Sequence, residues 1–93
     1  MTAPDPLLVA IRALVERVAG AARTLPDSGP ETPLSGAGFW LDSIELLEVV
    51  VACEAEFELT FDATRDFSGV ALETLGTLTE LIRAKRSRVR ADP

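Results

Sequence analysis

Hydrophobic residues recur at helical spacing in three parts of the chain. In residues 7–22, leucine, isoleucine and valine recur every three or four positions, and charged residues occupy other positions. This pattern predicts an amphipathic helix of about four to five turns. Asp5 can cap this helix, and Pro6 suits its first position, where the missing N–H costs nothing. Gly20 interrupts the pattern near its end.

A second helix is predicted from Ser43 to about Phe57. Asp42 stands directly before it, and Glu45 follows Asp42 by three residues, which is the spacing of a capping box.

A final helix is predicted after Thr74, its candidate capping residue, and is expected to end near Lys85 or Arg86. Its inward-facing residues are Leu75, Leu78, Leu81 and Ile82. Residues 87–93 are expected to form a flexible tail.

The connections complete the predicted fold. Residues 24–38 contain three prolines and three glycines, so they form a long loop, which Leu34 is expected to anchor to the core. Residues 58–61 alternate apolar and polar side chains in a short extended stretch, and Ser68 can cap a short third helix. The fold class is therefore all-α: a four-helix bundle with three longer helices, one short third helix and a long loop after the first.

The second helix has two apolar faces when its residues are placed 100° apart. The better core candidates are Leu46, Val49, Val50, Cys53 and Phe57. The roughly opposite side bears Ile44, Leu47 and Val51, beside Glu48 and Glu54. Leaving three such apolar side chains exposed forgoes roughly 1.5–3 kcal/mol each. Either the helix is central and buried on both sides, or these three residues form a docking stripe rimmed by carboxylates.

Composition limits the classes of protein to which the chain can belong. Its 93 residues, of which 47% are hydrophobic, suit one domain spanning residues 1–93, with a core at about 5–86. The longest apolar run, residues 49–53, is far shorter than the roughly 20 residues of a membrane span. The first five residues include no basic side chain, so no secretory signal is expected. We therefore expect a cytoplasmic protein, and a monomer.

Catalysis by this chain is not expected. It has no histidine and one cysteine, which excludes Ser-His-Asp and Cys-His systems, the usual Cys/His zinc sites and a disulfide within the chain. Carboxylate pairs would need a pocket, for which a small helical domain offers little volume. Cys53, on the core face, is interpreted as a buried, reduced thiol.

The charge is distributed unevenly. The formal net charge is −6, but residues 1–82 hold four basic and fourteen acidic residues, a charge of −10. Such a body repels nucleic-acid phosphates and attracts basic protein surfaces. The basic residues of the C-terminal segment invite an RNA-binding interpretation, but we favour a solvated helix end whose cations complement the helix dipole. They are Arg83, Lys85, Arg86, Arg88 and Arg90.

Ser43 is the candidate for covalent modification. A phosphate ester at a helix N-terminus lies opposite unpaired N–H groups and the positive end of the helix dipole. A long loop before the helix would make the hydroxyl accessible to a modifying enzyme. A serine that merely starts a helix well is the simpler alternative.

The stretch "LDSIELLEVVVACEAEFELTF", residues 41–61, resembles the acyl carrier protein family around its prosthetic-group serine. "TLGTLTELI", residues 74–82, resembles the last helix of that family. The predicted helices and the long loop follow the same order, so the resemblance covers about residues 5–86.

The resemblance implies that Ser43 bears 4′-phosphopantetheine derived from coenzyme A, with Asp42 beside the attachment point. It implies that acyl groups are held as thioesters on the thiol of that arm. Partners would be a phosphopantetheinyl transferase and acyl-processing enzymes such as acyltransferases and ketosynthases, with neither nucleic acid nor membrane. Contacts with them are implied for Ile44, Leu47, Glu48, Val51 and Glu54, which favours the docking stripe. The core face of the same helix, with Leu59 and Phe61, would line a core able to enclose an acyl chain.

The chain departs from the family pattern at several positions. Trp40 stands where many relatives have glycine, and Ala55 where many fatty-acid carriers have an acidic residue. The loop rich in proline and glycine and the basic C-terminal segment also differ from carriers of primary fatty-acid synthesis. We therefore expect a role in polyketide or related specialised biosynthesis, with primary fatty-acid synthesis as one alternative. The alternative from another class is a helical interaction module without a prosthetic group.

Overall fold

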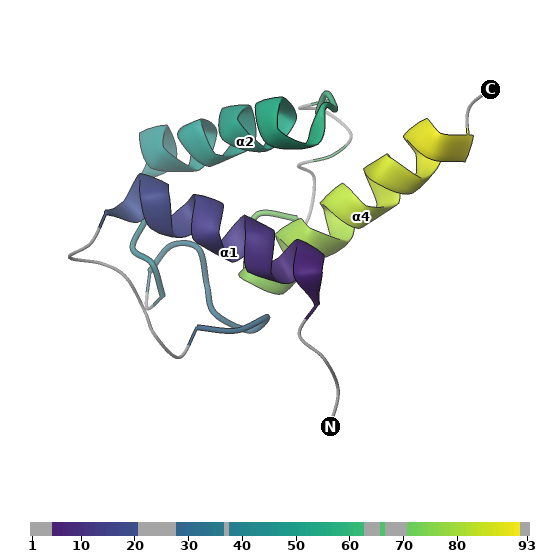
Figure 1. Ribbon diagram of the computed structural model, residues 1–93. Helices are drawn as coiled ribbons and strands as arrows, with labels where there is room; N and C mark the ends of the chain where they lie inside the picture. Colours follow the sequence, from purple (N-terminus) through teal and green to yellow (C-terminus); the bar gives the residue numbers. More distant parts are fainter. Residues whose placement is uncertain (1–4, 21–27, 37, 63–65, 67–70, 92–93) are drawn as a thin grey trace.

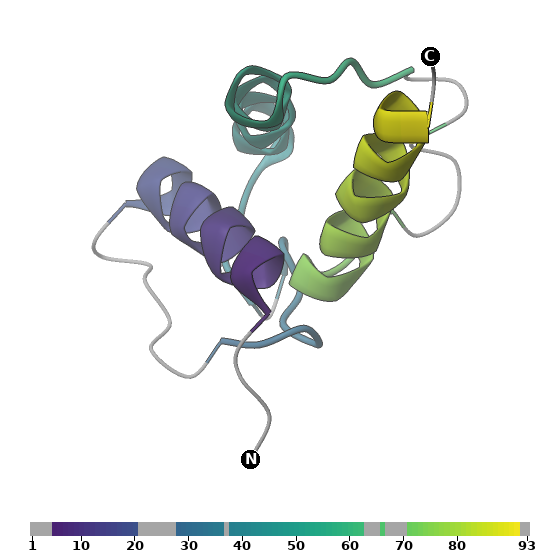
Figure 2. The ribbon, with the colours of Figure 1, turned by 45° about the vertical axis from the view of Figure 1, so that its right-hand side comes forward.

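Three α-helices make up the regular structure of the described part of the chain. The computed structural model describes residues 5–20, 28–36, 38–62, 66 and 71–91. The helices are α1 (Pro6–Ala19), α2 (Ser43–Phe57) and α4 (Leu75–Ala91), and no strand occurs in these ranges. α1 packs against both α2 and α4, as Figure 1 shows. Figure 2 looks nearly along α2, with α1 and α4 on either side below it. The all-α class predicted from the sequence is confirmed.

The start of α1 follows the prediction, and its end comes earlier. The side chain of Asp5 accepts a hydrogen bond from the Leu7 N–H at 3.0 Å, and Pro6 is the first helical residue. The helix ends at Ala19, because Gly20 adopts a φ of +89°, outside the helical region. The part of the predicted helix after Gly20 lies outside the described residues.

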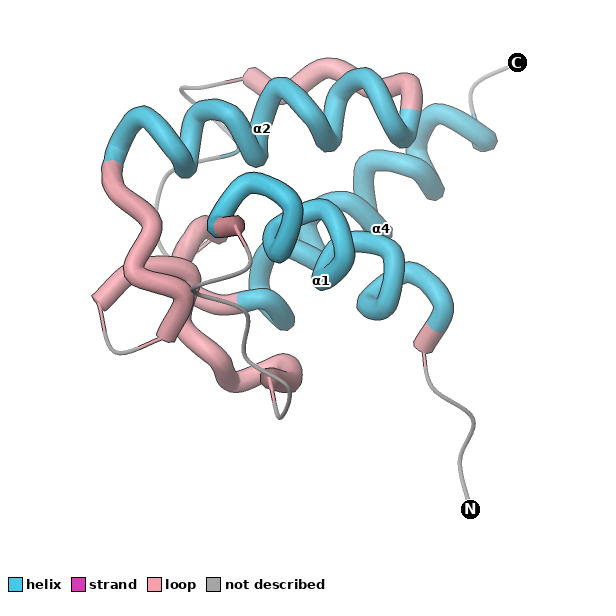
Figure 3. Tube along the Cα trace, turned by 60° about the vertical axis from the view of Figure 1, so that its left-hand side comes forward, coloured by secondary structure: helices cyan, strands magenta, loops and turns pink. Residues whose placement is uncertain are grey.

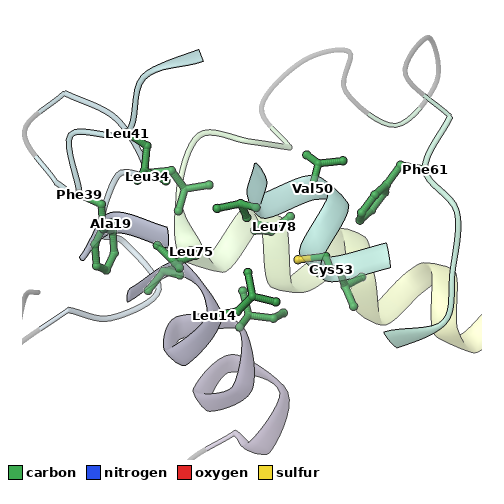
Figure 4. Close-up of a cluster of buried hydrophobic side chains, with 14 of the residues drawn as sticks. Leu14, Ala19, Leu34, Phe39, Leu41, Val50, Cys53, Phe61, Leu75 and Leu78 are labelled. Carbon is green, nitrogen blue, oxygen red and sulfur yellow. The ribbon is translucent and has the colours of Figure 1, made fainter. Parts of the chain in front are cut away.

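One hydrophobic core joins the three helices and the segments between them (Figure 4). α2 contributes Val49, Val50 and Cys53, all of which are buried, as its predicted core face requires. Phe57 and Leu46, also predicted there, are half-buried at the edge of the core. The other buried apolar residues are Leu7, Ile11, Leu14, Val15, Ala19, Leu34, Phe39, Leu41, Leu59, Phe61, Leu75, Leu78 and Ile82.

The second half of the long loop is tied to the start of α4. The Leu34 N–H donates to the carbonyl of Glu73, and the Leu75 N–H to that of Thr32, both at 3.0 Å. The Gly76 N–H donates to the carbonyl of Pro30 at 2.8 Å. We call these three hydrogen bonds the loop strap. Figure 3 shows the loop segments gathered at the end of the molecule where α2 begins. Leu34 is fully buried, which confirms its predicted anchoring role.

α4 is longer than the sequence pattern predicted. Thr74 caps it as expected, because its hydroxyl oxygen accepts from the Thr77 N–H at 3.1 Å. The prediction of an end near Lys85 or Arg86 is wrong, since the helix continues to Ala91. Residues 83–91 contain neither glycine nor proline and are mostly arginine, lysine and alanine, which favour helix.

Basic side chains of α4 make specific contacts with the rest of the domain. Arg83 forms an ion pair with Asp5, which joins α4 to the start of α1. The Lys85 Nζ lies 2.7 Å from a carboxylate oxygen of Asp66 and 5.7 Å from the centre of the Phe61 ring. These two cations therefore help to hold the domain together, a role more specific than complementing the helix dipole.

The region between α2 and α4 is described only in part. The N–H of Asp66 donates to the carbonyl of Asp62 at 2.7 Å, a hydrogen bond with helical spacing that lies before the predicted short helix. Ser68, the predicted cap of that short helix, lies outside the described residues. Within the described ranges, no helix has the length and apolar character needed to cross a membrane.

Candidate functional site

Ser43 is the first residue of α2, and its side chain is exposed. Local hydrogen bonds fix this end of the helix. The Asp42 carboxylate accepts from the Glu45 N–H at 2.8 Å, and the Glu45 carboxylate accepts from the Asp42 N–H at 3.1 Å. The capping box predicted from the sequence is therefore confirmed. It sets the direction in which the chain enters α2 and leaves the Ser43 hydroxyl at the surface.

This helix end is chemically suited to a phosphodiester. The N–H groups of Ser43 and Ile44 belong to the first turn, where a helix offers no backbone acceptor. They and the helix dipole present positive potential to an anion attached at this end. The carboxylates of Asp42 and Glu45 also lie at this N-terminal, positive end of the helix dipole. A phosphodiester on the exposed Ser43 oxygen would remain accessible to solvent and to a second protein.

The docking stripe is exposed to solvent. The side chains of Ile44, Leu47 and Val51 are 70%, 63% and 57% exposed, which shows that α2 is not buried on both sides. They line a groove of about 380 Å³ together with Glu48, Ala52 and Ala55. Of the two arrangements that the pattern left open, the structure has the exposed stripe. The docking stripe begins at Ile44, the residue directly after Ser43.

Glu54 has a structural contact that the sequence did not indicate. Its Oε2 atom accepts a hydrogen bond from the Phe61 N–H at 2.8 Å. The contact joins α2 to the chain segment that follows it, while Glu48 stays exposed at the groove. Ala55 lines the groove instead of a carboxylate, one turn beyond Val51. Ala55, already singled out from the sequence, extends the docking stripe by one helical turn.

Trp40 combines an exposed aromatic ring with an unusual backbone conformation. Its φ is +59°, in the left-handed region, and its side chain is 65% exposed. For an L-residue other than glycine this conformation costs roughly 1–2 kcal/mol. Glycine adopts this conformation without that cost, so the chain carries tryptophan on a backbone suited to glycine.

Cys53 is not part of a reactive site. Burial raises the pKa of its thiol to about 12, and the nearby Glu54 and Glu56 carboxylates act in the same direction. The thiol is therefore protonated at neutral pH and unreactive, as predicted for a core cysteine. Among the described residues, no group of three or more histidine, cysteine or acidic side chains could hold a metal ion.

A comparison with protein families shows the class of protein to which the chain belongs. The model of the family described as "Phosphopantetheine attachment site" matches residues 9–83, which is more than half of the chain. The chain belongs to this family. No curated protein and no solved structure matches it.

Membership of the phosphopantetheine-attachment family makes the chain a carrier protein with a covalently bound 4′-phosphopantetheine group. This confirms the resemblance to acyl carrier proteins and overturns the alternative of an interaction module without a prosthetic group. Carrier proteins of this family interact with modifying and biosynthetic enzymes and are generally not catalysts themselves. An exposed serine at a helix start and an exposed apolar groove beside it are consistent with such interactions.

Proposed function

We propose that Ser43 carries the 4′-phosphopantetheine arm and that the chain presents acyl groups on that arm to partner enzymes. The observation that carries this proposal is the exposed Ser43 hydroxyl at the first position of α2, directly before the docking stripe. Among the other described serines, Ser28 and Ser35 lie in the long loop and Ser87 lies inside α4, so none of them is the first residue of a helix. Within the described part of the chain, Ser43 is the one serine that combines a helix N-terminus with an adjacent apolar surface.

The side chains around Ser43 support separate parts of this role. Asp42 fixes the helix end through the capping box, so the attachment oxygen keeps a constant position relative to α2. We propose that Ile44, Leu47 and Val51 make the apolar contact with partner enzymes. Such a contact, small and centred on a few exposed side chains, is suited to binding that must also release quickly.

Carboxylates beside the docking stripe would select basic partners. Glu48 lies at the groove and is exposed. One carboxylate oxygen of Glu54 accepts the Phe61 N–H, but the carboxylate still carries its charge on the same side of α2 as Glu48. We propose that both carboxylates attract a basic enzyme surface before contact, which raises the association rate and makes it dependent on salt.

When bound, the prosthetic group supplies a thiol that holds acyl chains as thioesters. This chain contributes position, a docking surface and tethering, which raises the local concentration of the cargo at a docked enzyme. We propose that it performs no catalysis of its own and that it works as a cytoplasmic monomer with phosphopantetheinyl transferases, acyltransferases and ketosynthases.

The test is the covalent modification itself. Purified apo-protein would be incubated with coenzyme A and a broad-specificity phosphopantetheinyl transferase, and its intact mass recorded. Parallel samples would carry Ser43→Ala or the matched control Ser35→Ala, which removes another exposed serine. We expect one phosphopantetheine on the parent and on Ser35→Ala, and none on Ser43→Ala. Modification of Ser43→Ala would refute the assignment of the attachment residue.

We further propose that the carrier serves polyketide or related specialised biosynthesis. Support comes from the apolar Ala55 in the groove, from Trp40 before the attachment serine and from the basic end of α4. The holo-protein would replace the resident carrier in a reconstituted set of discrete fatty-acid synthesis enzymes. We expect little chain elongation. Elongation at the resident carrier's rate would favour primary fatty-acid synthesis instead.

A further inference from the structure

Trp40 is held in place by its two neighbours. Phe39 is fully buried and Leu41 is 3% exposed, so the side chains on both sides of Trp40 point into the core. The Phe39 N–H donates to the Pro33 carbonyl and the Leu41 N–H to the Leu34 carbonyl, each at 3.0 Å. The backbone at Trp40 is therefore fixed, and its indole is displayed at the surface.

The left-handed backbone conformation of Trp40 lowers the stability of the fold. Glycine adopts a positive φ without steric cost, whereas tryptophan does not. Among the described residues, Glu58 is the other non-glycine with positive φ, and it ends α2, where such a conformation is common. Trp40 ends no helix. A strained residue with an exposed side chain beside a functional site is a reason to look for a role in binding.

The position of Trp40 relative to the attachment serine suggests what it binds. Trp40 precedes Ser43 by three residues, so their Cα atoms lie within roughly 11 Å. Ile44 follows Ser43 and begins the docking stripe. Exposed apolar side chains therefore precede and follow the serine, and the carboxylates of Asp42 and Glu48 stand among them.

We propose that Trp40 is a contact residue for the enzymes that dock on α2, and that its indole enters an apolar pocket bordered by basic side chains on the partner. The proposal rests on the function proposed above and extends the docking surface to the loop before the helix. Tryptophan is enriched among the few residues that dominate binding energy at interfaces. Its ring offers a large apolar area with few rotatable bonds, so little conformational freedom is lost on binding.

The first experiment measures the rate of phosphopantetheine transfer to apo-protein at varied carrier concentration. Trp40→Gly removes the indole and suits the backbone, Trp40→Phe keeps an aromatic ring, and Val9→Ala is the matched control. Val9 is an exposed apolar residue of α1, away from α2 in sequence. We expect Trp40→Gly to lower kcat/KM at least about fivefold, mainly through KM. Trp40→Phe should recover part of the loss, and Val9→Ala should match the parent.

Thermal unfolding of the same variants separates binding from folding. Trp40→Gly should unfold at the parent's temperature or above it, because the strain of the left-handed tryptophan is gone. A lower rate together with a lower unfolding temperature would assign the indole to the fold and overturn the proposal. If the parent accepts phosphopantetheine and Trp40→Gly accepts it at the same rate, the proposal is overturned as well. A parent that accepts no phosphopantetheine would instead refute the proposed function.

A second measurement observes the indole directly. Trp40 is the single tryptophan, so labelling with 5-fluorotryptophan gives one fluorine resonance in the NMR spectrum. The labelled Ser43→Ala variant binds the transferase without turnover, and we expect the resonance to shift when unlabelled transferase is added. In the labelled parent, measured without a partner, the resonance should stay at the same position when apo-protein is converted to holo-protein. A shift on conversion to the holo form would assign the indole to the arm and overturn the contact proposed here.

Discussion

Replacing Glu54 distinguishes its structural contact from its expected role toward partner enzymes. The Oε2 atom of Glu54 accepts the Phe61 N–H at 2.8 Å, across seven residues of sequence. Glu48 lies on the same helix, is exposed, and lines the groove. Glu54→Ala removes both the hydrogen bond and the charge. Glu54→Gln keeps an acceptor oxygen and removes only the charge, while Glu48→Ala is the matched control for a surface carboxylate.

The expected loss of stability follows from that one bond. A hydrogen bond to a charged group contributes about 1.5–3 kcal/mol, and Glu54 is half-buried, so water weakens the bond. We expect Glu54→Ala to lower the free energy of unfolding by about 1–2 kcal/mol. In a domain of this size, that corresponds to a fall of about 4–16 °C in Tm. Glu54→Gln should lose less than half as much, and Glu48→Ala less than about 0.5 kcal/mol.

Urea unfolding monitored by circular dichroism measures these changes, and the slope against urea should be the same in all variants. The rate of phosphopantetheine transfer, measured at low and high salt, gives the second readout. We expect Glu54→Gln and Glu48→Ala to be slower at low salt and to approach the parent at high salt. A Glu54→Ala protein as stable as Glu48→Ala would show that the bond to Phe61 contributes nothing.

Three further predictions concern the loop strap, the thiol and the end of α4. A Cβ atom at Gly76 would lie 2.8 Å from the Pro30 carbonyl oxygen. Gly76→Ala should therefore lower the free energy of unfolding, measured by urea unfolding, by about 1–3 kcal/mol. Gly29→Ala, where there is room for a methyl group, should leave it unchanged. With a pKa raised to about 12, Cys53 of the apo-protein should react slowly with Ellman's reagent at pH 8 and rapidly in urea, and equal rates would refute its burial. Backbone amides of residues 87–91 should exchange with deuterium faster than those at the start of α4, as measured by NMR, which tests the expected flexible tail.

Features that depend on neighbouring residues were predictable from the sequence. The capping box of Asp42 and Glu45 and the cap at Thr74 each join residues three apart, so their spacing is enough to predict them. The docking stripe follows from helical periodicity alone. Its exposure did not, because the same pattern fits a helix buried on both sides.

Contacts between distant residues account for what the sequence did not reveal. The resemblance to acyl carrier proteins placed Glu54 among the partner-facing residues, but its bond to Phe61 depends on the path of the chain after α2. The left-handed conformation of Trp40 depends on how its neighbours bond to the loop. The end of α4 was misplaced for a different reason: the apolar pattern stops near Arg86, while helical backbone needs no apolar face to continue.

The loop strap has a consequence for the order of events during synthesis. The start of α4 bonds to Leu34, and Leu34 in turn accepts the N–H of Leu41, immediately before Asp42. The conformation on the N-terminal side of Ser43 therefore depends on residues about thirty positions later in the chain. While the ribosome is still elongating through residues 73–76, α1 and α2 can form, but the segment leading into α2 lacks its support. We infer that a modifying enzyme meets this surface in its final form only after residues 73–76 have folded, so fragments that end before them are poor substrates.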